Sequence, residues 1–196
     1  MHYLIDLDNT LLDTFYFEDN ELHFYWTKDF KKDFGVSPVI LKDLFSAEFL
    51  KQISTGQDIS FFIDAFIKKH SFNLSAADFI DYWLSRDANL KYDVWNWIQG
   101  LKSQGHSLHI ASNQPEIRMQ YLWHHFADWK DVFDKVFTSP RLGVAKPHED
   151  FFRLIQKDLN VPFSQMCLVD DDKANIDSAQ KLGVRTILFT DINCLK

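Results

Sequence analysis

Four apolar runs in the second half of the chain alternate with helical patterns, and this alternation constrains the fold more than any other feature. The apolar runs have the length of strands and are SLHIAS at 107–112, KVFTS at 135–139, MCLVD at 166–170 and RTILFT at 185–190. The helical patterns are YDVWNWIQGLKSQG at 92–105, IRMQYLWHHF at 117–126, EDFFRLIQKDLN at 149–160 and ANIDSAQKLG at 174–183. Strands separated by helices predict a parallel sheet with right-handed crossovers and helices on both faces.

The N-terminal run YLIDL at 3–7 has the composition of a fifth buried strand. Residues 19–85 then read as one helix after another, with helices expected at 19–35, 37–52, 58–70 and 75–85. Local signals support these bounds: Gly35 as a stop, Ser37 with Pro38 as a start, and Ser75 with Asp78 as a capping pair. We therefore expect an α/β fold. A Rossmann-like parallel five-stranded sheet core (residues 1–14 and 90–196) would carry an inserted α-helical domain (residues 15–89).

The charge balance of the chain disfavours two classes of partner. Its 196 residues carry a formal net charge of -7 and no block of Lys and Arg, which argues against nucleic acid or an anionic membrane as the main partner. A small anionic substrate is compatible with this charge, because a local pocket or a metal can overrule it. The first residues show no secretory signal pattern, and no apolar run is long enough to span a membrane, so we expect a cytoplasmic protein.

Only two cysteines, Cys167 and Cys194, are present, which is too few for a disulfide framework. Cys167 lies in the apolar run MCLV, where we expect a buried structural thiol.

Polar side chains gather where the expected strands end. Ligands of an open parallel sheet bind beyond the carboxyl ends of its strands. The residues that follow the first four strands are, in order, Asp6, Asp8 and Thr10; Ser112 and Asn113; Lys146; and Asp170, Asp171 and Asp172, with Asn175 on the next helix. Each group alone has a plainer explanation as a capped turn, a helix cap, a surface lysine or an acidic helix start. Their occurrence in this order at successive strand ends indicates one site.

The chemistry of these groups points to phosphoryl transfer. Several carboxylates tolerate one another only around a cation, and hard oxygen ligands select Mg²⁺. One aspartate can then form an aspartyl-phosphate, while Lys146 and the Ser112 hydroxyl neutralise phosphoryl oxygens. A second carboxylate two residues later points the same way from an extended strand end, so Asp8 can serve as acid and base beside Asp6.

Taken jointly, four ordered motifs resemble those of the haloacid dehalogenase (HAD) superfamily. They are DLDNT at 6–10, ASN at 111–113, AKP at 145–147 and LVDDDKANIDSAQKLG at 168–183. The resemblance covers nearly the whole chain, including a helical cap between the first and second motifs. The last motif and GVAKPHEDFF at 143–152 look most like one branch of this superfamily. That branch holds phosphatases of the glucose-1-phosphate type and the phosphatase domain of bifunctional epoxide hydrolases.

The resemblance implies a role for each motif residue. Asp6 would be the nucleophile and Asp8 the general acid and base, while Lys146 would neutralise the charge of Asp6 and of the phosphoryl group. Phosphoryl oxygens would be bound by Ser112, Asn113 and Lys146. Mg²⁺ would be held by Asp6, by Asp8 through its carbonyl, and by Asp171. Support would come from Thr10, Asp170 and Asn175.

The resemblance also implies that the inserted domain closes over the site as a cap, excludes water and contacts the substrate. The cap side carries no motif, so the candidates for lining the pocket are Phe15, Phe17, His23 and Trp26. Asp172 stands where the family usually has a small residue. Its carboxylate either caps the following helix or binds a metal-bound water.

The leading interpretation is a Mg²⁺-dependent phosphatase that hydrolyses a small phosphorylated metabolite, such as a sugar phosphate, as a monomer or homodimer. A 2-haloacid dehalogenase uses the same nucleophile on carbon, but a departing halide needs no acid, so Asp8 disfavours it. A phosphomutase and a catalytically silent scaffold with the same fold are further alternatives. A response-regulator receiver carries its phospho-accepting aspartate on the third strand and has no room for the insertion.

Overall fold

The computed structural model describes residues 1–18, 21–45 and 58–195. Its main element is a five-stranded sheet in the order β5-β4-β1-β6-β7. The strands are β1 (His2–Ile5), β4 (Ser107–Ser112), β5 (Lys135–Thr138), β6 (Met166–Asp170) and β7 (Arg185–Leu188). Every neighbouring pair is parallel, so the expected parallel five-stranded α/β sheet is confirmed.

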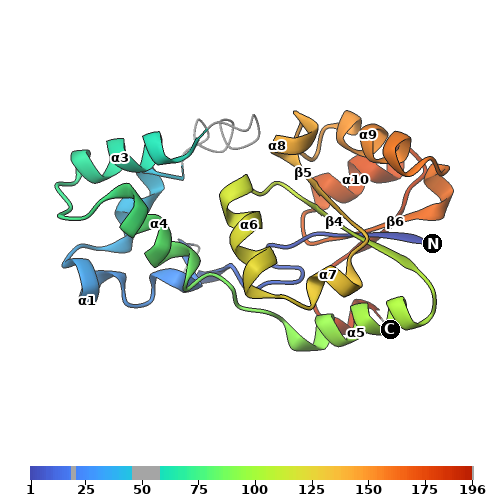
Figure 1. The fold of residues 1–196 in the computed structure, drawn as a ribbon, viewed down its shortest axis with the longest axis horizontal. Coiled ribbons are helices and arrows are strands. Elements are labelled where there is room, and N and C mark those ends of the chain that lie inside the picture. The colour runs from blue at the N-terminus through green and yellow to red at the C-terminus, as the bar shows by residue number, and fades with distance from the viewer. Residues whose placement is uncertain (19–20, 46–57, 196) are drawn as a thin grey trace.

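Helices cover both faces of this sheet. Successive strand residues point to opposite sides, so the apolar strands give the sheet two apolar faces to bury. Leu4 packs with α9 and α10, whereas its neighbour Ile5 packs with α5, α6 and α7. The helices are α5 (Tyr92–Ser103), α6 (Glu116–His125), α7 (Trp129–Val132), α8 (Ser139–Leu142), α9 (Glu149–Leu159) and α10 (Lys173–Lys181). Figure 1 shows α5 and α7 below the sheet and α8, α9 and α10 above it. Two short 3₁₀ turns, η3 (Phe163–Gln165) and η4 (Ile192–Leu195), complete this core lobe.

The described residues between 15 and 89 form a second lobe with its own hydrophobic core, which is centred on Trp26, Phe30 and Phe79. Its elements are β2 (Phe15–Glu18), β3 (Glu21–Phe24), η1 (Tyr25–Thr27), α1 (Phe30–Phe34), η2 (Pro38–Asp43), α3 (Ser60–Lys69) and α4 (Ala76–Leu84). The start of α4 carries the expected capping box, in which Ser75 and Asp78 each bond the other's backbone. In Figure 1 the carboxyl ends of the sheet strands face this lobe.

The helix expected over 19–35 is wrong in its first half. Instead, β2 and β3 pair as an antiparallel hairpin in which Phe15 faces Phe24 and Tyr16 faces His23. The Tyr16 and His23 rings stack with their centroids 5.3 Å apart, and aromatic pairs of this kind stabilise a two-stranded ribbon. An α-helix forms only at Phe30–Phe34, and Gly35 ends it with φ 72°.

The helix expected over 37–52 begins as predicted, because Ser37 accepts a hydrogen bond from the Val39 amide and Pro38 follows it. The segment Pro38–Asp43 is a 3₁₀ helix rather than an α-helix. Residues 46–52 lie outside the described residues. The second lobe is therefore mixed in structure rather than all-helical.

Two connections join the lobes and run side by side. The amide of Asp13 donates to Asn89 O at 2.8 Å, and the amide of Lys91 donates to Leu11 O at 2.9 Å. In addition, α6 packs on both lobes: Met119 and Leu122 belong to the core of the sheet, and Ile117 and Tyr121 pack against the core of the second lobe. One side of α6 is therefore enclosed between the lobes. Across the described ranges, none of the helices has the length and apolarity needed to cross a bilayer.

Both cysteines are free thiols. Cys167 is buried on β6, as expected, and burial raises its pKa to about 11. It therefore stays protonated at neutral pH and packs as a small apolar side chain.

Candidate active site

The predicted site residues meet at the carboxyl end of the sheet. Ile5 is in register with Ile110 and with Val169, so the ends of β1, β4 and β6 lie next to one another. Asp6 follows β1, Ser112 ends β4 and Asp170 ends β6, while Lys146 comes from the loop after α8. Residues that are far apart in the sequence therefore face one small volume.

Lys146 joins two of the carboxylates. Its Nζ donates to Asp6 Oδ1 at 2.8 Å and to Asp170 Oδ2 at 2.5 Å, and all three side chains are buried. Burial by itself opposes a charge on Lys146, but the two carboxylates outweigh this effect and hold its pKa above the ordinary value. Lys146 is therefore a permanent cation beside the predicted nucleophile.

Asp6, Asp170 and Asp171 form a group that can hold a metal ion. One ligand oxygen from each carboxylate lies within 4.8 Å of the others. Burial, with repulsion from Asp170, raises the pKa of Asp6 to about 7 and that of Asp171 to about 6. Three carboxylates face the single ammonium of Lys146, so a divalent cation with a preference for oxygen ligands fits this donor set.

The sequence suggested a supporting role for Asp170, and in the structure its carboxylate is also one of the three that could hold a metal ion. Its Oδ1 accepts hydrogen bonds from Asn175 Nδ2 and from the amide of Asp172, both at 2.9 Å. Asp172 itself accepts from the amide of Ala174 at 2.8 Å and is the N-cap of α10. Of the two roles considered for Asp172, the structure therefore shows helix capping.

Asp8 reaches the site in a different way from the one predicted. The strand β1 ends at Ile5, and the chain then turns so that the amides of Thr10, Leu11 and Leu12 all donate to the carbonyl of Leu7. The argument from an extended strand is therefore wrong for Asp8, which lies in a tight loop. Asn9 closes this loop with φ 52°, and its Oδ1 accepts from the amides of Thr14 and Phe15.

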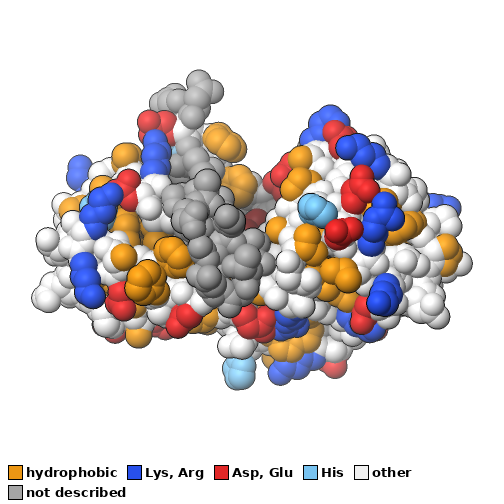
Figure 2. Space-filling view, turned by 90° about the horizontal axis from the view of Figure 1, so that it is seen from above, with side chains coloured by type: hydrophobic (Ala, Val, Ile, Leu, Met, Phe, Trp, Pro, Cys, Tyr) orange, Lys and Arg blue, Asp and Glu red, His pale blue; other side chains and the backbone are white. Residues whose placement is uncertain are grey.

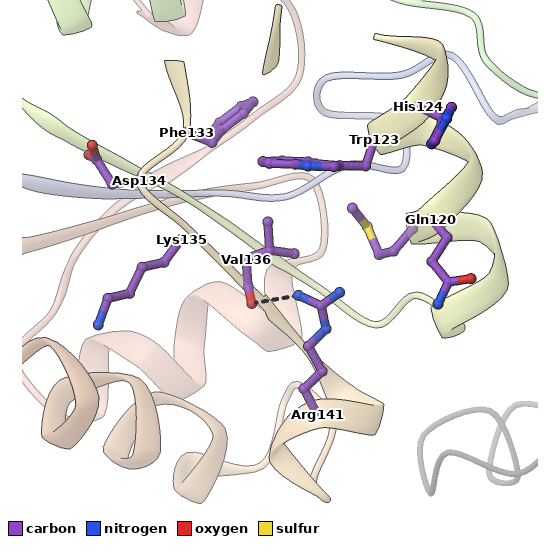
Figure 3. A pocket seen from close by; sticks show the side chains of 9 residues that line it. Gln120, Trp123, His124, Phe133, Asp134, Lys135, Val136 and Arg141 are labelled. Atoms are coloured by element: carbon purple, nitrogen blue, oxygen red, sulfur yellow. Dashed lines mark hydrogen bonds between the residues drawn. The ribbon is translucent and has the colours of Figure 1, made fainter. Parts of the chain in front are cut away.

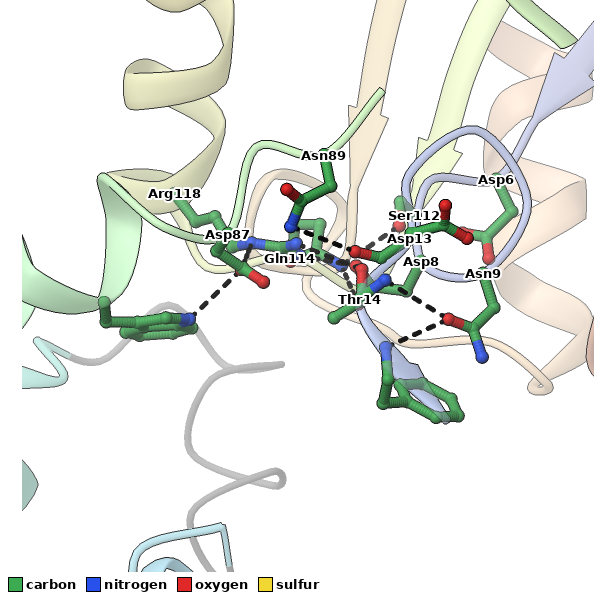
Figure 4. Close-up of polar contacts among 12 residues, drawn as sticks. Asp6, Asp8, Asn9, Asp13, Thr14, Asp87, Asn89, Ser112, Gln114 and Arg118 are labelled. Atoms are coloured by element: carbon green, nitrogen blue, oxygen red, sulfur yellow. Dashed lines mark hydrogen bonds and ion pairs between the residues drawn. The ribbon is translucent and has the colours of Figure 1, made fainter. Parts of the chain in front are cut away.

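Three donors orient the Asp8 carboxylate (Figure 4). Thr14 Oγ1 and Arg118 Nη1 donate to Oδ1 at 2.8 and 2.7 Å, and Gln114 Nε2 donates to Oδ2 at 2.6 Å. Burial opposes ionisation, but the Arg118 guanidinium outweighs it and holds the pKa of Asp8 below its usual value. The Asp8 side chain is still 31% exposed, so a substrate can reach it.

A buried ion-pair network continues from Asp8 into the second lobe. Arg118 is 2% exposed, and its Nε lies 2.6 Å from Asp87 Oδ2, which also accepts from Trp83 Nε1 at 3.1 Å. Figure 4 shows the guanidinium between the two carboxylates. Burial raises the pKa of Asp87 to about 6 even though Arg118 counteracts it. Through these contacts, the end of α4 is linked to the predicted acid and base.

Sequence reasoning missed Arg118, Gln114 and Asp87. Arg118 looks like a solvated position of an amphipathic helix, and Asp87 lies in the loop between α4 and α5. One signal was available for Arg118. It lies in the first turn of α6, the helix that starts directly after the ASN motif at the carboxyl end of the sheet.

Three predicted residues lie at the site with contacts that the sequence did not specify. The Asn113 side chain pairs with the backbone of Lys146 through two hydrogen bonds of 2.9 Å, so it fixes the lysine in place. Ser112 Oγ is buried and accepts from Gln114 Nε2 at 3.4 Å. Within the described ranges, the buried Thr10 hydroxyl has no hydrogen-bond partner, and Thr10 holds the loop through its amide instead.

A cavity of about 260 Å³ adjoins Asp8 and is lined by both lobes. Figure 2 shows the molecule hollowed between the lobes. Of the candidates for pocket lining, Phe15 and Trp26 line this cavity. Phe17 is 70% exposed, and His23 lines a separate cavity of about 140 Å³, so these two do not.

A larger cavity of about 380 Å³ lies away from the site, beside the edge strand β5 (Figure 3). Its charged side chains are already paired: Asp134 with Lys102 at 2.6 Å, Lys135 with Asp158 at 2.5 Å, and Arg141 with Glu116 at 2.6 Å. The catalytic groups predicted from the motifs lie elsewhere, so this cavity is not the candidate active site.

The model of one protein family, the haloacid dehalogenase-like hydrolases, matches residues 1–183. The chain belongs to this family. The resemblance drawn from the four motifs is thereby confirmed. The residues of these motifs are the ones that meet at the carboxyl end of the sheet.

Curated relatives of this HAD-like hydrolase include phosphatases. Sesquiterpene phosphatase astK of Aspergillus oryzae is 29% identical over 94 residues, which is 48% of this chain and 47% of the relative. D-ribitol-5-phosphate phosphatase of Bacteroides thetaiotaomicron is 27% identical over 108 residues, which is 53% of this chain and 52% of the relative. Drimenol cyclase drtB of Aspergillus calidoustus is 44% identical over 62 residues, 32% of this chain and 12% of that protein. The matched segments thus span about half or less of these relatives.

Solved structures share the fold of this HAD-like hydrolase almost completely. A HAD family enzyme of Bacteroides thetaiotaomicron, in complex with magnesium and inorganic phosphate, has a TM-score of 0.73 at 19% identity, covering 94% of this chain and 91% of that chain. An L-2-haloacid dehalogenase has a TM-score of 0.69 at 16% identity, covering 94% of this chain and 82% of that one. At such identities the likeness shows the fold alone.

Proposed function

We propose that this HAD-like hydrolase is a Mg²⁺-dependent phosphatase that cleaves a small phosphomonoester through an aspartyl-phosphate on Asp6. One observation carries the proposal. Asp6 lies against the permanent cation Lys146, and a second, separately oriented carboxylate, Asp8, faces the adjoining cavity. A nucleophile together with an independent acid and base is what hydrolysis of a phosphomonoester requires.

In the first step, a carboxylate oxygen of Asp6 attacks phosphorus. The new O–P bond forms as the bond to the leaving alcohol breaks, and that alcohol oxygen takes its proton from the protonated form of Asp8, which Arg118 makes the minor form. Lys146 and Ser112 stabilise the negative charge on the transferring group. The three donors that orient the Asp8 carboxylate hold it toward the cavity for this transfer.

In the second step, Asp8 takes a proton from water, which attacks phosphorus and releases phosphate together with the Asp6 carboxylate. Asp8 is suited to this role, because Arg118 favours its ionised form. A Mg²⁺ ion would be held by Asp6, Asp170 and Asp171, with the Asp8 carbonyl as the further predicted ligand. The ion would supply positive charge for the phosphoryl oxygens.

Two further observations support the proposal. The named functions of the two phosphatase relatives are phosphate-ester hydrolyses, and a structure with the same fold holds magnesium and phosphate together. We also propose that the second lobe, residues 15–89, acts as the cap of the site, since its aromatic side chains line the cavity beside Asp8.

The alternatives fit the site less well. A dehalogenase shares the fold, but a departing halide takes no proton, so three buried donors aimed at Asp8 would serve no step. A silent scaffold would not need the buried cluster of Lys146 with Asp6 and Asp170, whose desolvation is costly to folding. A phosphomutase uses the same groups and differs in whether phosphate is released to water.

The deciding experiment measures phosphate release from a panel of phosphomonoesters with Mg²⁺, with a chelator, and with Asp6→Asn. We expect turnover that needs Mg²⁺ and falls by several orders of magnitude in the variant, because the nucleophile is lost. Asp177→Asn, on the exposed face of α10 beside Lys173, is the matched control and should keep full activity. Chloride release from chloroacetate without phosphate release would instead establish a dehalogenase.

A further inference from the structure

The cavity beside Asp8 is polar on one side and aromatic on the other. The polar side is formed by the core lobe and the two connections between the lobes. Its side chains are already bonded among themselves and are Asp8, Thr14, Asp87, Gln114 and Arg118. The opposite wall is made by the second lobe and consists of Phe15, Phe24, Trp26, Phe45 and Trp83. A substrate with its phosphate at Asp6 would therefore place its alcohol portion against aromatic rings.

The aromatic wall is continuous. The Phe24 and Phe45 rings lie 4.9 Å apart, Phe45 and Trp83 lie 5.8 Å apart, and Trp26 and Trp83 lie 6.2 Å apart between centroids. These are ordinary aromatic contacts, so each ring is supported by its neighbours. The indole N–H of Trp83 is directed away from this wall toward Asp87, at 3.1 Å. An apolar surface of this kind is already formed before a substrate arrives.

Such a wall discriminates between alcohols by their hydroxyl groups. A sugar phosphate carries a hydroxyl on nearly every carbon, and each hydroxyl that loses water without gaining a partner weakens binding. Asp87 Oδ1 has no hydrogen-bond partner among the described residues. The Asp8, Gln114 and Arg118 side chains are engaged with one another, so this side has few free donors or acceptors to offer. A hydrocarbon chain has no hydrogen bond to water to give up on entering, and its affinity rises about fourfold for each buried methylene.

The size of the cavity sets a scale for the alcohol. A volume of about 260 Å³, at roughly 30 Å³ for each water-sized group, holds roughly eight or nine such groups. Aromatic walls also pack well against flat or unsaturated hydrocarbon.

We propose that the substrate is the phosphate monoester of an apolar alcohol with about eight or nine carbon atoms in the pocket, rather than a polyhydroxylated sugar phosphate. This inference rests on the proposed phosphatase function. The aromatic wall selects the alcohol, and the motif residues of the core lobe act on the phosphate.

A series of substrates tests the selection directly. We would measure kcat/KM with Mg²⁺ for ethyl, butyl, hexyl, octyl and decyl phosphate, for a diether phosphate of the same length as octyl phosphate, and for ribitol 5-phosphate. We expect kcat/KM to rise by up to about 16-fold with every two carbons up to octyl or decyl phosphate, since each buried methylene contributes about fourfold. Octyl phosphate should exceed both the diether and ribitol 5-phosphate by at least tenfold.

A matched pair of variants on β2 assigns the effect to the wall. Phe15→Ala removes a half-buried ring of the cavity and should lower kcat/KM for octyl phosphate about tenfold, while that for ethyl phosphate stays within twofold. Phe17→Ala removes a 70% exposed ring of the same strand, which lies outside the cavity and meets Phe15 only edge-on with centroids 6.2 Å apart, and it should change either value by less than twofold. Because Phe15 lies at the rim of the second lobe rather than in its core, the variant is expected to fold.

The possible results separate the two proposals. Faster turnover of ribitol 5-phosphate than of octyl phosphate, or rates that do not depend on chain length, would overturn the assignment of an apolar alcohol and leave the phosphatase standing. Equal effects of Phe15→Ala on octyl and ethyl phosphate would also overturn it. Absence of Mg²⁺-dependent release from every ester, including ethyl phosphate, would overturn the phosphatase itself.

Discussion

Arg118 Nη1 lies 2.7 Å from Asp8 Oδ1 while its Nε lies 2.6 Å from Asp87 Oδ2, so one buried guanidinium bridges the predicted acid and base to the connection between the lobes. Both Arg118 and Asp87 have almost no exposed side-chain surface. Buried charges of this kind are tolerated only while each has its partner. The orientation of Asp8 therefore depends on residues outside the four motifs.

Replacing Arg118 should destabilise the fold strongly. Arg118→Met leaves Asp8 and Asp87 without their cation, and we expect the free energy of unfolding to fall by about 3–5 kcal/mol. Combining it with Asp87→Asn should recover part of that loss, because one unpaired carboxylate is removed. Urea unfolding monitored by tryptophan fluorescence measures both effects. Arg153→Met breaks an exposed i,i+4 pair with Glu149 and should change the stability by less than about 1 kcal/mol.

The same variants report on catalysis. Where Arg118→Met is folded, we expect kcat to fall at least tenfold, because the Asp8 carboxylate loses one of its three donors and its nearest positive charge. Arg118→Lys should be intermediate, since a lysine keeps the charge but cannot face Asp8 and Asp87 at once. Unchanged kcat in folded Arg118→Met would contradict the role given to this contact.

Mg²⁺ should stabilise the protein in the absence of any substrate. The Lys146 ammonium bonds Asp6 and Asp170, so the group of three carboxylates that includes Asp171 keeps an excess of negative charge. A cation that binds only the folded state adds about 2.7 kcal/mol at 100 times its dissociation constant. Asp171→Asn should reduce this effect sharply, whereas Asp177→Asn should leave it unchanged. Thermal unfolding across a Mg²⁺ titration measures the shift. If Asp171→Asn gained as much stability as the unchanged protein, the ion would have to bind elsewhere.

A buried histidine should make the core lobe sensitive to acid. His109 on β4 is 2% exposed, with its Nε2 3.1 Å from His2 Nδ1. Burial, followed by the neighbouring His2, lowers the pKa of His109 to about 4. The folded state thus favours neutral His109, while the unfolded chain binds a proton near pH 6.5. Stability is therefore full above about pH 6.5 and is lost as the pH falls toward 4, by at most about 1.4 kcal/mol per pH unit.

His109→Leu should flatten this dependence, because the leucine cannot bind a proton in either state. Urea unfolding at pH 7, 6 and 5 gives the slope for each protein. His124→Leu, at an exposed position of α6, is the matched control and should keep the slope of the unchanged protein. An identical slope in His109→Leu would show that other groups cause the acid sensitivity.

Much of the core lobe followed from the sequence for identifiable reasons. The alternation of apolar runs with helices leaves a parallel sheet as the arrangement that buries both faces, and parallel strands bring their carboxyl ends to one edge. Asp6, Ser112, Lys146 and Asp170 could thus be assigned to one site before any geometry was known. The capping pair of Ser75 and Asp78 was also readable, because its hydrogen bonds join residues three positions apart.

The second lobe was harder to predict because its local signals are ambiguous. The aromatic residues between Phe15 and Trp26 fit either one face of a helix or the alternating sides of a strand. Antiparallel pairing of β2 with β3 decided in favour of strands, with Phe15 opposite Phe24. Pairing of this kind depends on which surfaces the rings can bury, and the sequence of the segment alone does not contain that information.

The sequence by itself determined the order of strands and helices in the core lobe and which groups meet at the carboxyl end of its sheet. Only the tertiary structure decided how Asp8 is held, that Arg118 and Asp87 are buried with it, and that aromatic rings face it across the cavity. The physical reason is the range of the interactions. Helix and strand patterns follow from neighbours in the sequence, whereas burial of Arg118 arises where α6 packs between two lobes, a contact that no local pattern encodes.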